Sequence, residues 1–178
     1  ALGKTTTASH NVGIGYGALK ENTTGANNTA VGKSALDQNT TASNNTAVGY
    51  QSLKANTTGA NNTAVGHSAL GASTTAGYNS ALGYNALGAL TTGQLNVGVG
   101  YGALQSITTG TNNTSLGYQA GTGTVTHNDN VFIGHSAGEA RLSANNVAIG
   151  ASALMASSEG AETGGNMIAI GYRAGQYI

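Results

Sequence analysis

The chain contains no cysteine, no proline and no tryptophan, and only one of its 178 residues is phenylalanine. Without cysteine it has neither internal disulfides nor thiol chemistry. Charged residues make up 7% of the sequence, against about 25% in an ordinary globular domain, and the formal net charge is zero. Binding to nucleic acid or to an acidic membrane needs a basic patch, so this balance indicates neither partner.

Long apolar runs are also missing. No stretch approaches the roughly 18 apolar residues of a membrane span, so we expect no membrane insertion of this segment. The first ten residues, ALGKTTTASH, lack the basic-then-apolar order of a signal peptide. The composition is rich in Gly, Asn and Thr, which is typical of disordered low-complexity chains. The order of the residues argues against disorder, as follows.

The sequence is an internal repeat, which decides the fold before any other feature. A glycine that follows a short apolar run falls at positions 15, 32, 49, 66, 83, 100, 117, 134, 150 and 171. The first intervals are seventeen residues, and the last two are sixteen and twenty-one. The unit reads N-T-A-V-G-Y-x-A-L-x-x-N-T-T-G-x-N, and we number its positions from one to seventeen. A disordered chain has no reason to hold this phase, so the repeat indicates an architecture.

Positions two and four of the unit carry the β-branched and aliphatic residues, with Gly, Ala or Ser mostly between them. Val97/Val99 and Val147/Ile149 show this best. A two-residue period predicts a short strand with one buried face, and we expect these aliphatic columns, with the Leu of position nine, to form a thin core. The glycine at position five permits a turn. The unit is too short for a helix pair, which leaves an all-β, parallel β-solenoid of about ten 17-residue coils.

Stacked coils place like residues in ladders along the rod. Position one is asparagine in nine units, and its amides are expected to pass hydrogen bonds from coil to coil. This structural ladder comprises Asn11, Asn28, Asn45, Asn62, Asn79, Asn96, Asn113, Asn130 and Asn146. A coil buries about three apolar side chains and is not stable alone, so the chain 1–178 is expected to be a single repeat domain. The units are regular to about residue 134, and the region 151–178 holds irregular coils and an insertion.

The segments NVAIG (146–150) and MIAIG (167–171) resemble the head repeats of trimeric autotransporter adhesins, the YadA-like left-handed β-roll. The stretch from Asn45 to Gly59 is also similar to repeats of bacteriophage tail-fibre proteins. The resemblance covers essentially the whole chain, although these units have seventeen residues against about fourteen in typical adhesin heads. It implies a left-handed coil and a homotrimer exposed on a virion or a bacterial cell surface and used for attachment.

We therefore expect an extracellular structural or attachment segment rather than an enzyme, with no cofactor. Acids and histidines are scattered, with no paired carboxylates and no nucleophile beside a base. Ala1-Leu2 aligns with Ala18-Leu19, so the chain opens within a unit and is expected to belong to a longer fibrous protein. Its partners would be its own copies and a cell-surface glycan or protein receptor. The alternative is a monomeric solenoid that binds ice or a glycan through one flat face.

Position six is the most variable and is the candidate surface ladder. It carries Tyr16, Tyr50, His67, Tyr84, Tyr101, Tyr118, His135 and Tyr172, with Lys33 and Ala151 in the remaining units. Sugars would stack on such rings, but shielding of a corner or of a trimer seam explains the column as well, and we favour shielding. His67 and His135 lie four coils apart, about 19 Å, which is too far for one metal ion.

Three other features of the sequence bear on binding. The sequence HNDN (127–130) is compatible with a Ca²⁺ site, but it offers one acid, so we favour turn capping. The Thr-Thr pairs suggest an ice-binding face, yet neighbouring residues of a strand point to opposite sides, which leaves one exposed Thr row. The insertion is expected to bulge as a loop, and its possible receptor contacts are Ser157, Ser158, Glu159, Glu162 and Thr163.

Overall fold

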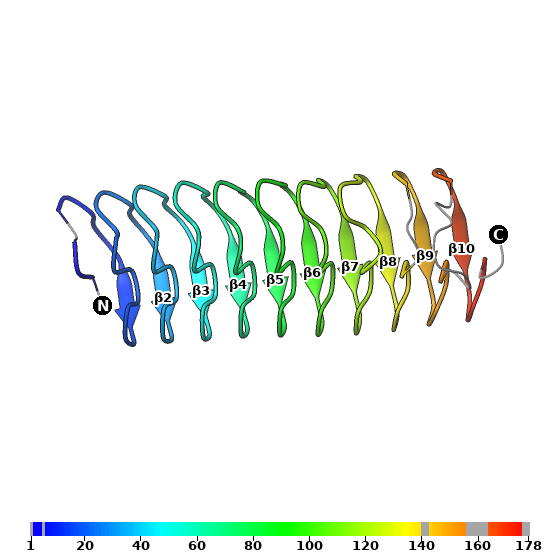
Figure 1. Cartoon of the computed structure of the whole chain (residues 1–178), viewed down its shortest axis with the longest axis horizontal. Coiled ribbons are helices and arrows are strands. Elements are labelled where there is room, and N and C mark those ends of the chain that lie inside the picture. Colours follow the sequence, from blue (N-terminus) through cyan, green and yellow to red (C-terminus); the bar gives the residue numbers. More distant parts are fainter. Residues whose placement is uncertain (1, 5, 140–142, 156–163, 176–178) are drawn as a thin grey trace.

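The structure is a computed structural model that describes residues 2–4, 6–139, 143–155 and 164–175. These residues form a rod of stacked coils, with one short strand in each coil (Figure 1). The strands are β1 (Val12–Ile14), β2 (Thr29–Val31), β3 (Thr46–Val48), β4 (Thr63–Val65), β5 (Ser80–Leu82), β6 (Val97–Val99), β7 (Thr114–Leu116), β8 (Val131–Ile133), β9 (Val147–Ile149) and β10 (Ile168–Ile170). The described residues contain no helix, and thus none that is long and apolar enough to cross a membrane.

All ten strands belong to one parallel sheet whose spatial order is the order of the chain. Each residue pairs with the residue at the same unit position of the next coil, for example Val31 with Val48. The units of sixteen and twenty-one residues keep this register, since Ile133 pairs with Ile149, and Ile149 with Ile170. The predicted parallel β-solenoid is therefore confirmed, and the sequence repeat becomes a set of ladders along the rod.

In each ordinary coil, the core consists of small residues that face the leucine of position nine. The Leu column at position nine is buried, as predicted, and Ala fills positions three and eight, as Ala30 and Ala35 do beside Leu36. The prediction for the strand was wrong in one respect. The aliphatic residues of positions two and four lie on the outer face of the sheet, and the central residue of each strand points inward.

The thinness of the coil explains this inversion. Gly98 takes the inward place in β6, and a Cβ added there would lie 3.1 Å from Leu87 Cγ and 3.2 Å from the carbonyl oxygen of Ala103. A single methyl group already fills the interior at position three. Alanine is thus the largest residue that fits opposite the Leu column in an ordinary unit, and the larger β-branched residues must point outward.

The glycine of position five forms a corner that requires glycine, as predicted. Its φ angle lies between +119° and +141° in every coil. Adjacent corners also approach closely, because a Cβ on Gly83 would stand 2.4 Å from the carbonyl oxygen of Gly100. No side chain is tolerated in this place, which accounts for the strict phase of the glycine in the sequence.

The position-one asparagines form a continuous hydrogen-bonded ladder, which is half-buried at Asn11 and buried from Asn28 to Asn146. The Oδ1 of Asn79, for example, accepts from the backbone N–H of Asn96 at 2.9 Å. The Nδ2 of Asn96 in turn donates to Asn79 Oδ1 and to the carbonyl of Gly110. The ladder passes from Asn11 through Asn146 to the backbone of Met167. It satisfies polar groups that a coil interior cannot hydrate.

A second, shorter asparagine ladder occupies position twelve. Asn39 and Asn56 each donate from Nδ2 to the Oδ1 of the preceding rung, beginning at Asn22. The column then changes to Ser73, and further on to Leu90 and Ile107. At the change, Asn56 Oδ1 and Ser73 Oγ are buried without a hydrogen-bond partner in the described structure. Position twelve thus changes from polar to apolar residues along the rod, before Thr124 restores a buried polar side chain.

Candidate functional site

The outer face of the sheet is an uncovered surface with a continuous aliphatic column. We call the residues of positions two and four the outer sheet face. Position four is aliphatic in every coil, and its residues are Ile14, Val31, Val48, Val65, Leu82, Val99, Leu116, Ile133, Ile149 and Ile170. Position two adds Val12, Thr29, Thr46, Thr63, Ser80, Val97, Thr114, Val131, Val147 and Ile168. None of these residues is charged, and none is buried.

Exposure along this face is considerable. Ile14 is 59% exposed and Leu82 is 51% exposed. At about 4.8 Å per strand, the column of position four runs for about 43 Å. Soluble monomers rarely leave an apolar strip of this length uncovered. Sequence reasoning missed this site because it placed the aliphatic columns inside, and the signal that would have found it is the constant small residue between them.

Next to this face, across the corner glycine, the position-six residues form a stack of rings. Contacts between ring centroids run from 4.9 to 5.2 Å through Tyr50, His67, Tyr84, Tyr101, Tyr118 and His135, which we call the aromatic ladder. The three central tyrosines are nearly parallel, with interplanar angles of 8° and 11°. Lys33 extends the stack, since its Nζ lies 5.7 Å from the Tyr50 ring centroid.

This stacking limits what the ladder can bind. A ring inside the stack has a neighbouring ring against each face, and it presents only its edge and its hydroxyl group to solvent. Tyr84, Tyr101 and Tyr118 are accordingly 48%, 47% and 47% exposed. A sugar that packs on an aromatic face therefore finds no free face inside the ladder. Among the described rungs, free ring faces occur where the column is interrupted and at its two ends.

The Thr-Thr pairs give one exposed row, as the strand geometry predicted. The first threonine of each pair donates its hydroxyl to the backbone of the next coil, as Thr57 Oγ1 does to the carbonyl of Thr74 at 3.0 Å. The second threonine is exposed, in Thr24, Thr41, Thr58, Thr75, Thr92 and Thr109. The row beside it is irregular, because Ser43, Ala60, Gly77 and Gln94 follow one another at position sixteen.

The segment 127–130 serves in contacts between coils. Asn128 Oδ1 accepts from the backbone N–H of Thr111 at 2.8 Å, and Asp129 Oδ1 accepts from Asn112 Nδ2 at 3.1 Å. The described residues hold no group of three or more potential metal ligands here or elsewhere. The side chains of Asn128 and Asp129 thus bind the neighbouring coil, as turn capping requires, whereas His127 Nδ1 is buried without a hydrogen-bond partner in the described structure.

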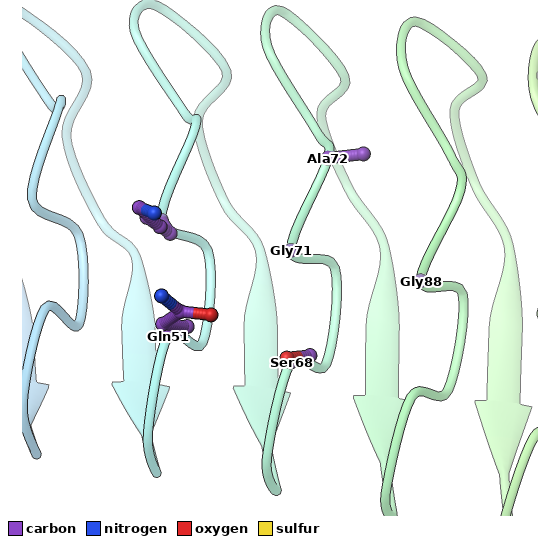
Figure 2. Close-up of a pocket in the computed structure, with 6 residues that line it drawn as sticks. Gln51, Ser68, Gly71, Ala72 and Gly88 are labelled. Atoms are coloured by element: carbon purple, nitrogen blue, oxygen red, sulfur yellow. The ribbon is translucent and has the colours of Figure 1, made fainter.

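A shallow hollow of about 310 Å³ lies on another side of the rod, lined by Gln51, Lys54, Ser68, Gly71, Ala72 and Gly88 (Figure 2). It forms because position ten loses its side chain at Gly71 and Gly88, after Lys54 in the preceding coil. Backbone and small residues make up most of its surface, and they present no convergent set of polar groups. The hollow is a consequence of the sequence variation in this column.

The first coils hold a small group of ion pairs. Hydrogen bonds from the ammonium groups of Lys4 and Lys20 lower the pKa of Glu21, and the Lys20 Nζ lies 3.2 Å from its Oε1. The predicted receptor loop, with Ser157, Ser158, Glu159, Glu162 and Thr163, lies outside the described residues. The described sites are thus the outer sheet face and the aromatic ladder, both of them uncharged surfaces apart from Lys33 and the histidines.

These features define the class of the protein. It is a parallel β-solenoid whose strands carry small residues inward, except for Phe132 in β8, and an aliphatic column outward. No protein-family model, no curated protein and no solved structure matches the chain.

Proposed function

We propose that the chain is a segment of a homotrimeric attachment fibre, on a virion or a bacterial cell surface, in which the outer sheet faces of three copies pack together. The observation that carries the proposal is the uncovered column of position four. Purely parallel sheets occur almost only with both faces covered, and here the coil interior covers one face alone. A closed symmetric oligomer covers the other face in every copy at once.

The chemistry of the face supports copies of this chain as its partners. Its twenty residues include no charge, so they pack without leaving an unpaired ion. Its register is periodic, which matches another face of the same period and no irregular surface. The aromatic ladder lies beside it, where its edges would border the seam. The resulting rod would hold a receptor-binding part away from the particle, and its function would be mechanical and adhesive.

Oligomeric mass tests the proposal. Light scattering after size exclusion should give one species near three times the 17.4 kDa chain. Leu82→Glu with Leu116→Glu places charges in the middle of the face and should yield monomers. The matched control, Thr75→Glu with Thr92→Glu, places the same charges on the exposed Thr row and should leave the mass unchanged. A wild-type monomer at micromolar concentration would overturn the trimer.

The second candidate is a monomeric solenoid that binds ice through the exposed Thr row. The regular exposure of Thr58, Thr75 and Thr92 favours it. Two observations argue against it, because ice binding needs a regular array in two dimensions. The residues at position sixteen are irregular, and the first Thr hydroxyl of each pair is already hydrogen-bonded to a backbone carbonyl. An ice-binding chain would be a monomer and would show thermal hysteresis. A fibre segment would show no thermal hysteresis and would not be a monomer.

A further inference from the structure

The column of position six remains in register through the last described coils. Inter-coil hydrogen bonds run from the backbone N–H of position seven to the carbonyl of position six in the preceding coil. Ser136 donates to Tyr118, Ser152 to His135, and Arg173 to Ala151, at 2.8 to 3.0 Å. His135, Ala151 and Tyr172 therefore occupy three successive rungs of one column, beside strands β8, β9 and β10 (Figure 1).

One rung of this column has no side chain beyond a methyl group. Ala151 stands between the ring of His135, at the end of the aromatic ladder, and the ring of Tyr172. Rings on neighbouring rungs lie about 5 Å apart, so two rungs separate these rings by about 10 Å. Each filled rung of the ladder holds one ring, and the empty rung leaves room for one ring. We call this space the Ala151 gap.

The exposure of Tyr172 agrees with an open gap. It is 71% exposed, against 47% for Tyr101, whose neighbours stack on both faces; Tyr172 has no ring on the side of Ala151, and it is also the last described rung. Within the described part of the chain, no aromatic ring stacks on Tyr172. The other interruption of the column differs, because the Lys33 side chain occupies its own rung and reaches the Tyr50 ring. Only the interruption at Ala151 combines two ring walls with a methyl floor.

We propose that the Ala151 gap binds one pyranose ring of an acidic glycan. A pyranose ring has flat C–H faces that pack on aromatic rings, while its hydroxyl groups at the edge stay in water. His135 and Tyr172 supply two such rings, on opposite sides of one ring-sized space. Amphipathic aromatic side chains commonly present an apolar body together with a polar group in this way.

Arg173 assigns the charge of the sugar. Its exposed guanidinium Cζ lies over the Tyr172 ring, 5.1 Å from the ring centroid, so the ring that forms one wall of the gap carries a cation. Guanidinium groups bind carboxylates through two parallel hydrogen bonds. A sugar with a carboxylate substituent, of the uronic or sialic type, satisfies both the ring walls and this cation. The inference gives the proposed attachment function a receptor chemistry and rests on that function for its biological role.

The test starts from Ala151→Tyr, which fills the empty rung with the residue found at this position in six other units. The variant should fold and melt at or above the wild-type temperature, because it continues the stack. The purified 178-residue chain should bind glucuronic-acid-ended or sialic-acid-ended oligosaccharides, measured by isothermal titration calorimetry. Ala151→Tyr should abolish this binding, and Tyr172→Ala should weaken it by about tenfold or more.

The controls separate the parts of the proposal. Tyr101→Ala removes a ring from inside the aromatic ladder and should leave binding unchanged. Arg173→Gln should weaken the binding of acidic sugars and leave the binding of their neutral counterparts unchanged. Equal binding by wild type and Ala151→Tyr, or no binding of the acidic oligosaccharides at millimolar concentration, would overturn the proposal. So would preferential binding of a free aromatic compound, or of neutral sugars.

Failure here is distinguishable from failure of the fibre proposal. The mass of each sample, measured before titration, reports the trimer and does not depend on the sugar. A trimer that binds no acidic glycan would contradict the gap as a site and leave the outer sheet face as the seam. A monomer that binds the glycan in the gap would contradict the trimer and support the gap as a binding site.

Discussion

The ring of Phe132 packs against Gly138 of the same coil, in the space that a leucine fills in other coils. A Cβ added to Gly138 would lie 2.3 Å from Phe132 Cδ1, and one added to Gly121 would lie 2.8 Å from Phe132 Cδ2. Phe132 replaces the inward alanine of the strand, and the two glycines replace the Leu of position nine in its own coil and in the preceding one. The volume of the core is conserved, because the large side chain comes from the strand at position three instead of from the Leu column at position nine.

This exchange predicts strong coupling between the two positions. Phe132→Ala should lower the free energy of unfolding by about 3–5 kcal/mol, because it opens a ring-sized cavity. Gly138→Leu should also destabilise, through overlap with the ring. The double variant restores the alanine and leucine of the ordinary unit and should recover part of both losses in a double-mutant cycle measured by urea denaturation.

The backbone does not forbid leucine at this place. Gly138 has a φ of +69°, and Leu104 adopts +51° at the same unit position. If the double variant is no more stable than the sum of the single effects predicts, the pairing of Phe132 with Gly138 is not what conserves the core.

The repeat predicted the solenoid, its register and the buried leucines, because the spacing of like residues follows directly from stacked coils. It did not predict which strand face is inside. A two-residue period is symmetric, and the usual preference for buried Val or Ile gives the wrong answer where Leu87 leaves space for no more than a methyl group. The glycines at 121 and 138 were visible in the sequence, but their cause was not, since Phe132 lies on the opposite side of the coil.

The candidate site was predictable to a similar extent. The exposed column of position six followed from its variability, whereas the stacking that covers the ring faces of Tyr84 and Tyr101 needed ring distances and angles. The Ala151 gap needed the register of the last coils as well. The sequence assigned Ala151 to position six, and the inter-coil hydrogen bonds show that the sixteen-residue and twenty-one-residue units keep it between His135 and Tyr172.

The end of the second asparagine ladder predicts a stabilising substitution. Ser73→Asn would add a rung whose Nδ2 donates to the orphaned Oδ1 of Asn56, as Asn56 itself donates to Asn39 at 3.0 Å. The new hydrogen bond should be worth about 1 kcal/mol, because it satisfies a buried acceptor. The melting temperature, followed by circular dichroism, should rise by about 2–4 °C.

A comparison substitution, Leu90→Asn, tests whether polarity alone explains this effect. It introduces an amide one rung too far along, beside Ser73 rather than Asn56, and should destabilise by burying polar atoms without their partners. A melting temperature that falls with Ser73→Asn would show that Leu90 does not tolerate the longer neighbour.

The longer ladder predicts a large cost for removing one of its rungs. Asn96 is fully buried, and its amide accepts from Asn113 N–H and donates to Gly110 and to Asn79. Asn96→Ala leaves these groups unsatisfied and should cost about 3 kcal/mol or more in urea denaturation. Gln94→Ala, at an exposed position two residues away, should change stability by less than about 0.5 kcal/mol. Similar values for the two variants would mean that water replaces the lost amide.

The corner glycine predicts the most severe effect of a single methyl group. Gly83 has a φ of +136°, a region essentially closed to other residues, and an added Cβ would stand 2.4 Å from the carbonyl oxygen of Gly100. Because that oxygen belongs to the backbone of the next coil, it can move only if the coils separate. Gly83→Ala should therefore destabilise by about 3 kcal/mol or more.

Gly88→Ala is the matched control, since the atom nearest its added Cβ is the end of the Asn85 side chain, which can rotate away. Its cost should stay below about 1 kcal/mol. Thermal melts of the two variants in parallel measure the difference, and equal melting temperatures would contradict the requirement for glycine at the corner.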